Sequence, residues 1–324
     1  MKVIIPVAGI GTRLKPHTNS LPKPLLHIAG KTILDYLLQP LEKIKPDEVI
    51  FVVGYKGAMI REHVTRHYSF KATFVEQDRL LGLGYAVHSA METAGDGPLL
   101  VLLGDTIVEC DLGKFITTGD YTLGLRQVDD PTRFGIAEIS GGFVTGVEEK
   151  PSRPKTDLAL IGLYYFHEST RLHEELNRLV TSGKKTSGEI QLTDALAAMI
   201  GSGTKFVPFE VEQWYDCGKK ETMLETNRHI LKRMPPARQI DGSTIVDPVY
   251  IADDVRIDSS VIGPNVSISS GAVISGSTLS DSIVGANATV EKAVLRESIL
   301  GNNTKLKGAT GVVNLGDSSE VSCF

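Results

Sequence analysis

The side chains best suited to chemistry lie in a glycine-containing stretch near the N-terminus. An apolar run, Val-Ile-Ile-Pro-Val, is typical of a buried strand and is followed by Gly9, Gly11, Thr12 and Arg13, with Lys23 further on. Glycines at the end of a strand let the backbone approach a ligand closely, so that free N–H groups can surround an anion. An arginine fork and a lysine point charge both bind phosphate. The stretch therefore predicts a triphosphate-binding loop.

Two common phosphate-binding motifs do not fit this stretch. A dinucleotide fingerprint needs a third glycine where the chain has Leu14, and a Walker loop before Gly30-Lys31-Thr32 needs a glycine where the chain has Leu25. On the two glycines alone, a tight surface turn without a ligand remains an equal alternative.

Two aspartates end apolar runs further along the chain. Asp105 closes Leu102-Leu103-Gly104, and Asp216 follows Trp214-Tyr215. Mg²⁺ prefers one or two carboxylates together with phosphate oxygens and water, so a pair of aspartates at one sheet edge suits it. Taken singly, each aspartate is more often a turn or cap residue.

Composition restricts the class of protein. The chain has 324 residues, which suits two domains, with a net charge of −5 and an acidic excess confined to residues 240–324. No basic stripe is present, so nucleic acid is not an expected partner. We expect no membrane span and no signal peptide, and three scattered cysteines give no disulfide framework, so the cytoplasm is the expected location.

The first 235 residues alternate between strand-like and helical patterns. Strands are expected at 2–8, 48–53, 71–75 and 98–103, and helices near 32–44, 57–68, 84–94, 168–180, 189–201 and 219–233. This alternation predicts a parallel sheet covered by helices on both faces, with ligands at the carboxyl ends of the strands. After residue 120 we expect shorter, more alternating strands.

The pattern changes after Met234-Pro235-Pro236. Isoleucines recur about every six residues, as at Ile245, Ile251 and Ile257, which is the mark of a parallel β-helix rather than of an antiparallel sandwich. Many hexapeptide-repeat proteins are acyltransferases with a histidine base, but the last histidine of this chain is His229, before the repeats. A structural role and self-association into a homo-oligomer are the better expectations.

The longer pattern Gly-x-Gly-Thr-Arg-Leu-x-Pro-x-Thr, with Pro-Lys-Pro-Leu after it, resembles the signature of the sugar-1-phosphate nucleotidyltransferases. The resemblance covers nearly the whole chain. It implies an α/β fold with a Rossmann-like, mostly parallel sheet in a catalytic domain over residues 1–235. A hexapeptide-repeat left-handed β-helix would follow over residues 236–324.

The resemblance also implies roles for individual residues. A sugar-1-phosphate oxygen would attack the α-phosphorus of a nucleoside triphosphate and expel pyrophosphate, with Mg²⁺ as the cofactor. The catalytic residues would be Arg13, Lys23 and Asp105, and the metal ligands Asp105 and Asp216. The nucleotide would be bound by Ala8, Gly9, Gly11, Thr12, Gln77 and Gly82. The sugar phosphate would be bound by Gly135, Glu149, Lys150 and Gly162.

Several of these roles have plain structural alternatives. The pair Glu149-Lys150 could be a solvated ion pair, and Gly82 could serve only packing at a helix start. Thr193-Asp194 could simply open a helix, and Cys217 is more readily a small packed residue than a reactive thiol.

The substrate remains open at this stage. Glucose-1-phosphate is the expected sugar, and dTTP and UTP are both expected donors, because thymine and uracil share a pairing edge and differ by one methyl group, worth about 1 kcal/mol. A non-catalytic regulatory or scaffold subunit of the same architecture is the alternative. It is disfavoured because all five charged residues of the expected site are present.

Overall fold

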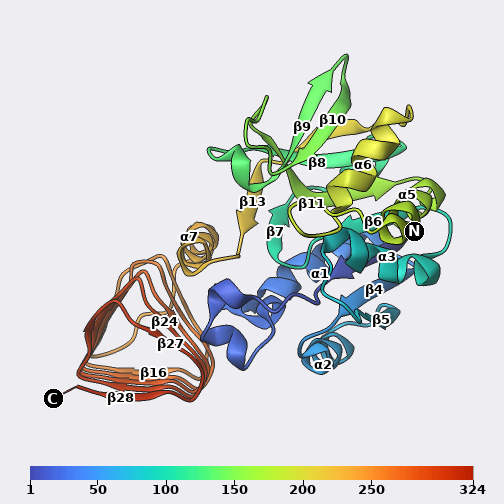
Figure 1. The fold of residues 1–324 in the computed structure, drawn as a ribbon. Coiled ribbons are helices and arrows are strands. Elements are labelled where there is room, and N and C mark those ends of the chain that lie inside the picture. The colour runs from blue at the N-terminus through green and yellow to red at the C-terminus, as the bar shows by residue number, and fades with distance from the viewer. Residues whose placement is uncertain (324) are drawn as a thin grey trace. The chain divides into compact units, whose positions relative to one another are not determined.

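The computed structural model describes residues 1–323 (Figure 1). The chain forms two compact units, of which the first contains residues 1–9 and 36–214 and the second contains residues 10–35 together with the chain from residue 215 onward. The domain boundary predicted near residue 235 stays a prediction. The segment that carries Gly11, Arg13 and Lys23 belongs to the same compact unit as the C-terminal repeats.

A nine-stranded mixed sheet forms the centre of the first unit, in the order β10-β9-β11-β6-β1-β4-β5, with β8 on β11 and β12 on β8. Its strands are β1 (Lys2–Pro6), β4 (Glu48–Val53), β5 (Ala72–Glu76), β6 (Leu99–Leu102), β8 (Tyr121–Gln127), β9 (Gly135–Ser140), β10 (Phe143–Glu149), β11 (Leu158–Phe166) and β12 (Val207–Glu210). The strands β6, β1, β4 and β5 run parallel, so their carboxyl ends share one edge. The predicted α/β class is confirmed.

Helices cover this sheet (Figure 1). They are α1 (Ile33–Ile44), whose first turn belongs to the second unit, α2 (Gly57–His67), α3 (Leu83–Ala94), α4 (Leu112–Thr117), α5 (Thr170–Ser182) and α6 (Leu192–Gly201). Apolar side chains of α3, α5 and α6, such as Val87, Leu176 and Leu196, are fully buried with Ile4 and Val101 of the central strands. The helical pattern of the sequence located the starts of all these helices except α4 to within three residues, and α4 was not expected.

One strand expectation was wrong. Strands after residue 120 were expected to be short and alternating, but β11 has nine residues, eight of them buried. It pairs with β8 along one side and with β6 and β9 along the other. A strand that is buried on both faces is apolar throughout instead of alternating.

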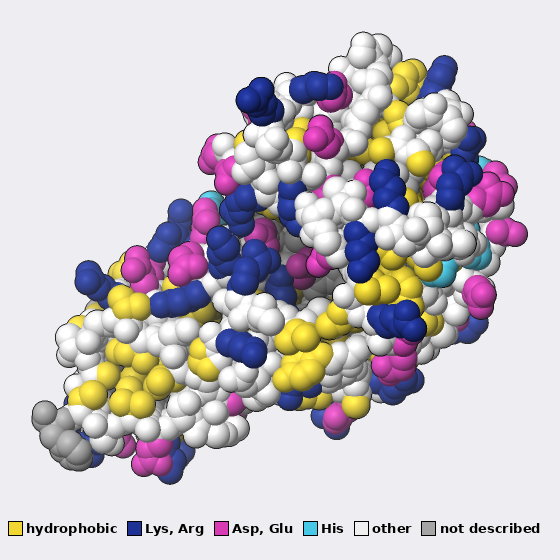
Figure 2. All heavy atoms as spheres, in the orientation of Figure 1, with side chains coloured by type: hydrophobic (Ala, Val, Ile, Leu, Met, Phe, Trp, Pro, Cys, Tyr) yellow, Lys and Arg dark blue, Asp and Glu magenta, His cyan; other side chains and the backbone are white. Residues whose placement is uncertain are grey.

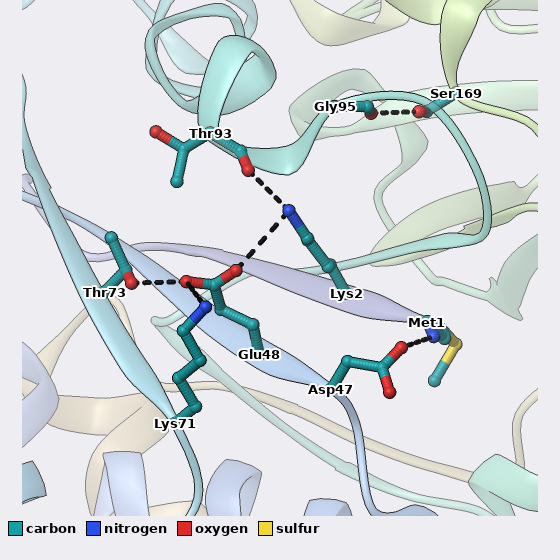
Figure 3. A network of polar contacts seen from close by, with 9 residues as sticks. All are labelled: Met1, Lys2, Asp47, Glu48, Lys71, Thr73, Thr93, Gly95 and Ser169. Atoms are coloured by element: carbon teal, nitrogen blue, oxygen red, sulfur yellow. Dashed lines mark hydrogen bonds and ion pairs between the residues drawn. The ribbon is translucent and has the colours of Figure 1, made fainter.

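A polar network joins the amino ends of the parallel strands (Figure 3). Glu48, the first residue of β4, is buried and accepts a hydrogen bond of 2.5 Å from the Thr73 hydroxyl. It also forms ion pairs with Lys71 at 3.2 Å and Lys2 at 3.4 Å. The Thr73 hydrogen bond, with the two lysines, holds the pKa of Glu48 below its ordinary value. This network lies at the opposite ends of the strands from the predicted ligand site.

The C-terminal repeats form three five-stranded parallel sheets, as is typical of a left-handed β-helix (Figure 1). The first sheet contains β14 (Thr244–Ile245), β17 (Val261–Ile262), β20 (Thr278–Ser280), β23 (Val294–Arg296) and β26 (Thr310–Gly311). The second contains β15 (Val249–Ile251), β18 (Val266–Ile268), β21 (Ile283–Val284), β24 (Ile299–Leu300) and β27 (Asn314–Leu315). The third contains β16 (Arg256–Asp258), β19 (Val273–Ser275), β22 (Thr289–Glu291), β25 (Lys305–Lys307) and β28 (Glu320–Ser322).

The register of these strands explains the irregular hexads. Ile262 pairs with Leu279 and Leu279 with Leu295, so these coils take 17 and 16 residues, not three full hexads. The predicted inward isoleucines line the core of the coil, where Ile262 and Ile268 are fully buried. The β-helix prediction is confirmed.

The second unit also contains helix α7 (Lys220–Leu231) and the segment of residues 10–35. That segment is built from three short 3₁₀ turns, Thr12–Leu14, His17–Asn19 and Lys23–Leu25, and from the small strands β2 (His27–Ile28) and β3 (Lys31–Thr32). Two further short strands are β7 (Thr106–Glu109) and β13 (Gln213–Asp216).

On the face shown in Figure 2, basic and acidic side chains are interspersed, and hydrophobic side chains gather over the β-helix coils. Within residues 1–323, no helix combines the length and the apolar character needed to cross a membrane.

Candidate active site

The glycine loop after β1 closes on itself. Gly11 has a φ of +69°, and a Cβ there would lie 2.9 Å from Cγ2 of Thr18 and 3.1 Å from Cβ of Lys23. The Thr18 hydroxyl donates a hydrogen bond of 2.9 Å to the Gly11 carbonyl. Lys23 is buried beside this turn and is only 7% exposed. The left-handed backbone and the close neighbours explain why the position is glycine.

Arg13 lies beside the predicted metal ligand Asp216 in the second unit. A Cβ at Gly218 would lie 2.8 Å both from Nη2 of Arg13 and from Oδ1 of Asp216. The Gly218 N–H donates a hydrogen bond of 2.9 Å to the same carboxylate oxygen. The absence of a side chain at Gly218 therefore leaves a small space that the Arg13 guanidinium and the Asp216 carboxylate both face. The Arg13 side chain is exposed to solvent.

Other predicted residues follow the carboxyl ends of adjacent parallel strands in the first unit. Ala8 and Gly9 follow β1, Gln77 follows β5, and Asp105 follows β6. Gly104 lets the ends of β6 and β1 approach, because a Cβ there would overlap Val7 and lie 2.8 Å from the Pro6 carbonyl. A Cβ at Gly9 would meet no atom within 4 Å, so the backbone is open at this point.

The predicted sugar-phosphate residues Gly135, Glu149 and Lys150 meet at the paired ends of β9 and β10. Gly135 is the register partner of Glu149, and Lys150 forms an ion pair of 3.4 Å with Glu149. The Thr193 hydroxyl donates a hydrogen bond of 2.7 Å to Oε2 of Glu149. A Cβ at Gly135 would lie 3.1 Å from both of those oxygens, so a glycine keeps this polar corner accessible.

The sequence analysis gave no binding role to three residues near this corner. Thr193 was considered only as a residue that opens a helix, yet it orients Glu149 directly. In the same unit, Oδ2 of Asp194 and Nε1 of Trp214 are buried and have no hydrogen-bond partner among the described residues. Buried polar atoms normally have partners, so these two indicate groups left for a ligand. The sequence signals were the Thr193-Asp194 pair and the Trp214-Tyr215-Asp216 run, both of which the sequence analysis singled out for other reasons.

The remaining predicted residues have local partners. Gln77 donates its side-chain amide to the Arg79 carbonyl at 2.8 Å, and Gly82 caps α3 with a φ of +112° against Glu189 and Ile190. Gly162 packs on Leu103, where a Cβ would lie 2.5 Å from Cγ. Glycine at these two positions is thus explained by packing, and their ligand roles stay predictions.

The residues present fit a magnesium ion by their chemistry. Asp105 and Asp216 are hard oxygen donors, each partly exposed at a strand end. Among residues 1–323, no group of three or more His, Cys, Asp and Glu side chains is arranged to hold a metal. A set of two carboxylates is what Mg²⁺ takes when substrate phosphates complete its shell. Asp105 and Asp216 belong to different compact units, so their sharing of one ion stays a prediction.

Cys217 is a packed residue. It is fully buried, and its sulfur lies 3.8 Å from the Tyr215 carbonyl and 3.9 Å from the Thr226 hydroxyl. This agrees with the packing alternative weighed for it.

Comparisons with known proteins identify the family of this chain. The family model described as "Nucleotidyl transferase" matches residues 2–233. The chain is 30% identical to a "Glucose-1-phosphate thymidylyltransferase" of Streptomyces antibioticus over 99% of both chains. It is 31% identical to a "Low-salt glycan biosynthesis nucleotidyltransferase Agl11" of Haloferax volcanii, over 95% of this chain and 94% of that one.

A solved structure shares the fold. It is a UDP-glucose pyrophosphorylase complexed with UDP-glucose, with a TM-score of 0.63 and 22% identity, covering 72% of this chain and 99% of the other. The matched family model, the full-length relatives and the glycine loop at the strand edge lead to one conclusion: this chain is a member of the nucleotidyl transferase family.

Proposed function

We propose that this protein transfers a nucleotidyl group from dTTP or UTP to a sugar-1-phosphate, with glucose-1-phosphate as the expected acceptor, and releases pyrophosphate. The observation that carries the proposal is the joint approach of Arg13 and Asp216 to Gly218, in the same compact unit as the Gly11 loop. A cation and a carboxylate facing one open space suit a metal-bound triphosphate.

The acceptor needs little activation. A phosphate monoester is largely ionised at neutral pH, with a second pKa of about 6, so no general base is required. The protein must instead align the reactants and compensate negative charge. Arg13 would neutralise the triphosphate and help pyrophosphate leave, while Lys23 and Lys150 would hold the acceptor phosphate. Mg²⁺, when bound by Asp105 and Asp216, would neutralise charge on the phosphate oxygens.

Glu149 and its neighbours would recognise the sugar. The Thr193 hydroxyl fixes one carboxylate oxygen of Glu149, which leaves the other for sugar hydroxyls and Lys150. The unpartnered oxygen of Asp194 and the indole N–H of Trp214 would bind further hydroxyls. A polyol offers both donors and acceptors, so it satisfies both kinds of group.

The nucleotide base would be bound by Gln77 and the backbone around Gly82. A glutamine amide has a donor and an acceptor and pairs with the edge that thymine and uracil share. On binding, the amide would exchange its contact with the Arg79 carbonyl for the base.

A panel assay tests the proposal. Pyrophosphate release would be measured with each nucleoside triphosphate against several sugar-1-phosphates in the presence of Mg²⁺. We expect turnover with dTTP, UTP or both, only when a sugar-1-phosphate is present. A chain that binds nucleotide but releases no pyrophosphate with any pair would be a scaffold, and the proposal would be wrong.

The β-helix would join copies of this chain into a homo-oligomer. Its β14-containing sheet carries the exposed side chains of Val261 (38%) and Val294 (52%) on its second and fourth strands. Light scattering of the full chain and of Val294→Lys would test this face. An unchanged mass for the variant would exclude it as the contact between copies.

A further inference from the structure

One face of the β-helix is covered by the segment that carries the glycine loop. The outward side chains on the β15-containing sheet include Ile283 and Ile299, each only 4% exposed. The equivalent outward valines of the β14-containing sheet, Val261 and Val294, are 38% and 52% exposed. The contacts described next show that residues 10–35 lie against the covered sheet, within one compact unit.

The first half of the segment is fastened to the last coil. Nε2 of His17 donates a hydrogen bond to Oδ1 of Asn314 at 2.7 Å, and His17 is 4% exposed. The Ser20 hydroxyl donates to Oδ2 of Asp317, also at 2.7 Å. Asn314 begins β27 and Asp317 lies in the turn after it, so two hydrogen bonds reach from the loop to the same part of the last coil.

Gly316, between those two acceptors, touches the same stretch. The three atoms nearest to a Cβ at this position would be Cβ, the carbonyl oxygen and Cγ of Pro16, at 2.9, 3.2 and 3.3 Å. At the equivalent points of the preceding coils, Gly285 and Gly301 leave room for the next coil. Gly316 has an ordinary φ, and its lack of a side chain leaves room for Pro16 in the same way.

The second half of the segment is fastened to the first coils. The side-chain oxygen of Asn227 accepts hydrogen bonds from the Ala29 N–H at 3.0 Å and from the Ser267 hydroxyl at 2.5 Å. A Cβ at Gly30 would overlap the ring of Tyr250. Asn227 thus links the segment to the β-helix near the opposite edge of the same sheet.

The residues that contact the last coil are close in sequence to the groups proposed to bind phosphate. Thr18 follows the anchored His17 and donates its hydroxyl to the Gly11 carbonyl, while its methyl group packs where a Gly11 Cβ would be. Arg13 lies three residues before Pro16. A shift of the turn at Gly316 would therefore move Pro16, His17 and Thr18, and with them the Gly11 turn and Arg13.

We infer that Asn314, Gly316 and Asp317, at the C-terminal end of the β-helix, are positioning residues that set the geometry of the phosphate-binding loop and thereby the affinity for the nucleoside triphosphate. The inference rests on the proposed function for its kinetic consequence. Its structural part, the fastening of the loop, can be measured without any activity.

Gly316→Ala is the sharpest test. The added methyl group meets Pro16 first, and a displacement near 1 Å in a site can cost up to about 100-fold. We expect KM for the nucleoside triphosphate to rise about 10-fold, KM for the sugar-1-phosphate to stay within about twofold, and the midpoint of thermal unfolding to change little. An unchanged nucleotide KM in a variant that folds would overturn the inference.

A matched pair separates positioning from β-helix stability. Asn302 and Asp317 lie at equivalent points of successive coils, and each accepts a backbone N–H of the preceding coil, from Ala286 at 2.8 Å and from Asn302 at 2.7 Å. Only Asp317 also accepts the Ser20 hydroxyl. We expect Asp317→Ala to raise nucleotide KM and Asn302→Ala to leave it unchanged. Equal effects of the two variants would show a general loss of stability and overturn the inference.

Hydrogen exchange of the peptide covering residues 10–35 gives the independent reading. Faster exchange in Gly316→Ala and Asp317→Ala, but not in Asn302→Ala, would support fastening of the loop even if the wild type released no pyrophosphate. In that case the proposed function alone would fail. Wild-type exchange rates in all three variants would overturn the inference whatever the activity.

Discussion

The imidazole of His17 and the side-chain amide of Asn314 are joined by a hydrogen bond of 2.7 Å, although 297 positions separate them in the chain. The first of these residues lies in the segment predicted to bind phosphate and the second in the last coil of the repeats. Residues 10–35 and the repeats therefore build one compact unit, and the loop predicted to bind the triphosphate rests on the β-helix.

This contact predicts a pH dependence of stability. Burial is the main cause that lowers the pKa of His17 from 6.5, opposed by the hydrogen bond to Asn314 and by Asp317, with Lys220 adding to the lowering. The unfolded chain then binds more protons than the folded one as the pH falls. Stability should be fully present above about pH 6.5 and should decrease below it.

Urea unfolding at several pH values between 5 and 8 would measure the effect. His17→Gln should flatten the dependence between pH 6.5 and 5, and the exposed His67→Gln should not. If the free energy of unfolding changes with pH equally in the wild type and in His17→Gln, this histidine does not contribute to the pH dependence.

Removal of the Asp216 charge should stop catalysis without unfolding the chain. Asp216→Asn keeps an oxygen that can accept the Gly218 N–H. Even outer partners of metal ligands cost about 10–100-fold in metal affinity or activity when removed, so loss of a ligand should cost at least as much. Pyrophosphate release at rising Mg²⁺ would be the measurement, with thermal unfolding as the check on folding. Near-normal turnover would remove Asp216 from the metal site.

Gly135→Ala should weaken acceptor binding selectively. The new methyl group would lie 3.1 Å from Oε2 of Glu149 and from the Thr193 hydroxyl. It would therefore occupy the polar corner where the sugar is proposed to bind. We expect KM for the sugar-1-phosphate to rise about 10-fold, equivalent to about 1.4 kcal/mol, with nucleotide KM unchanged. Gly146→Ala on the neighbouring strand is the control, because its Cβ would meet only Glu138 at 3.8 Å. A similar rise in both variants would place the sugar elsewhere.

Glu48→Gln should reduce stability and leave kinetics intact. The carboxylate is held by Thr73, Lys71 and Lys2 at the amino ends of the strands (Figure 3). Loss of its charge should cost about 1–2 kcal/mol at neutral pH. Because the folded pKa of Glu48 is lowered from 4.5, the wild-type advantage should be present above pH 4.5 and disappear as the pH falls further. Denaturant unfolding at pH 7 and pH 3 would measure the difference in unfolding free energy between the wild type and Glu48→Gln. An equal difference at both pH values would contradict the prediction.

Much of the fold could be predicted because its local signals agree with its tertiary structure. The apolar runs at β1, β4 and β6 are strands buried on both faces, and the inward isoleucines of the coils recur at nearly constant spacing. The placement of Asp105 after β6 follows from the same rule, since the apolar run ends where the strand does.

The pairing of distant polar residues could not be predicted from the sequence. Asn314 occupies the strand position that holds Ile299 in the preceding coil, and Asp317 occupies the turn position of Asn302. Neither residue type identifies the distant partner, His17 or Ser20, that it meets. The bond between Thr193 and Glu149 joins positions 44 residues apart on different elements. Such contacts depend on how the chain returns to the site and not on local propensity.

The segment of residues 10–35, predicted to bind phosphate, spans the covered sheet from Tyr250 in its first coil to Asn314 in its last. Because the segment is anchored at both edges of this sheet, the number of coils corresponds to the length of the segment. Inserting or deleting a single coil would leave an intact β-helix but would separate one anchor from its partner. A change in the number of coils would therefore require a compensating change in residues 10–35.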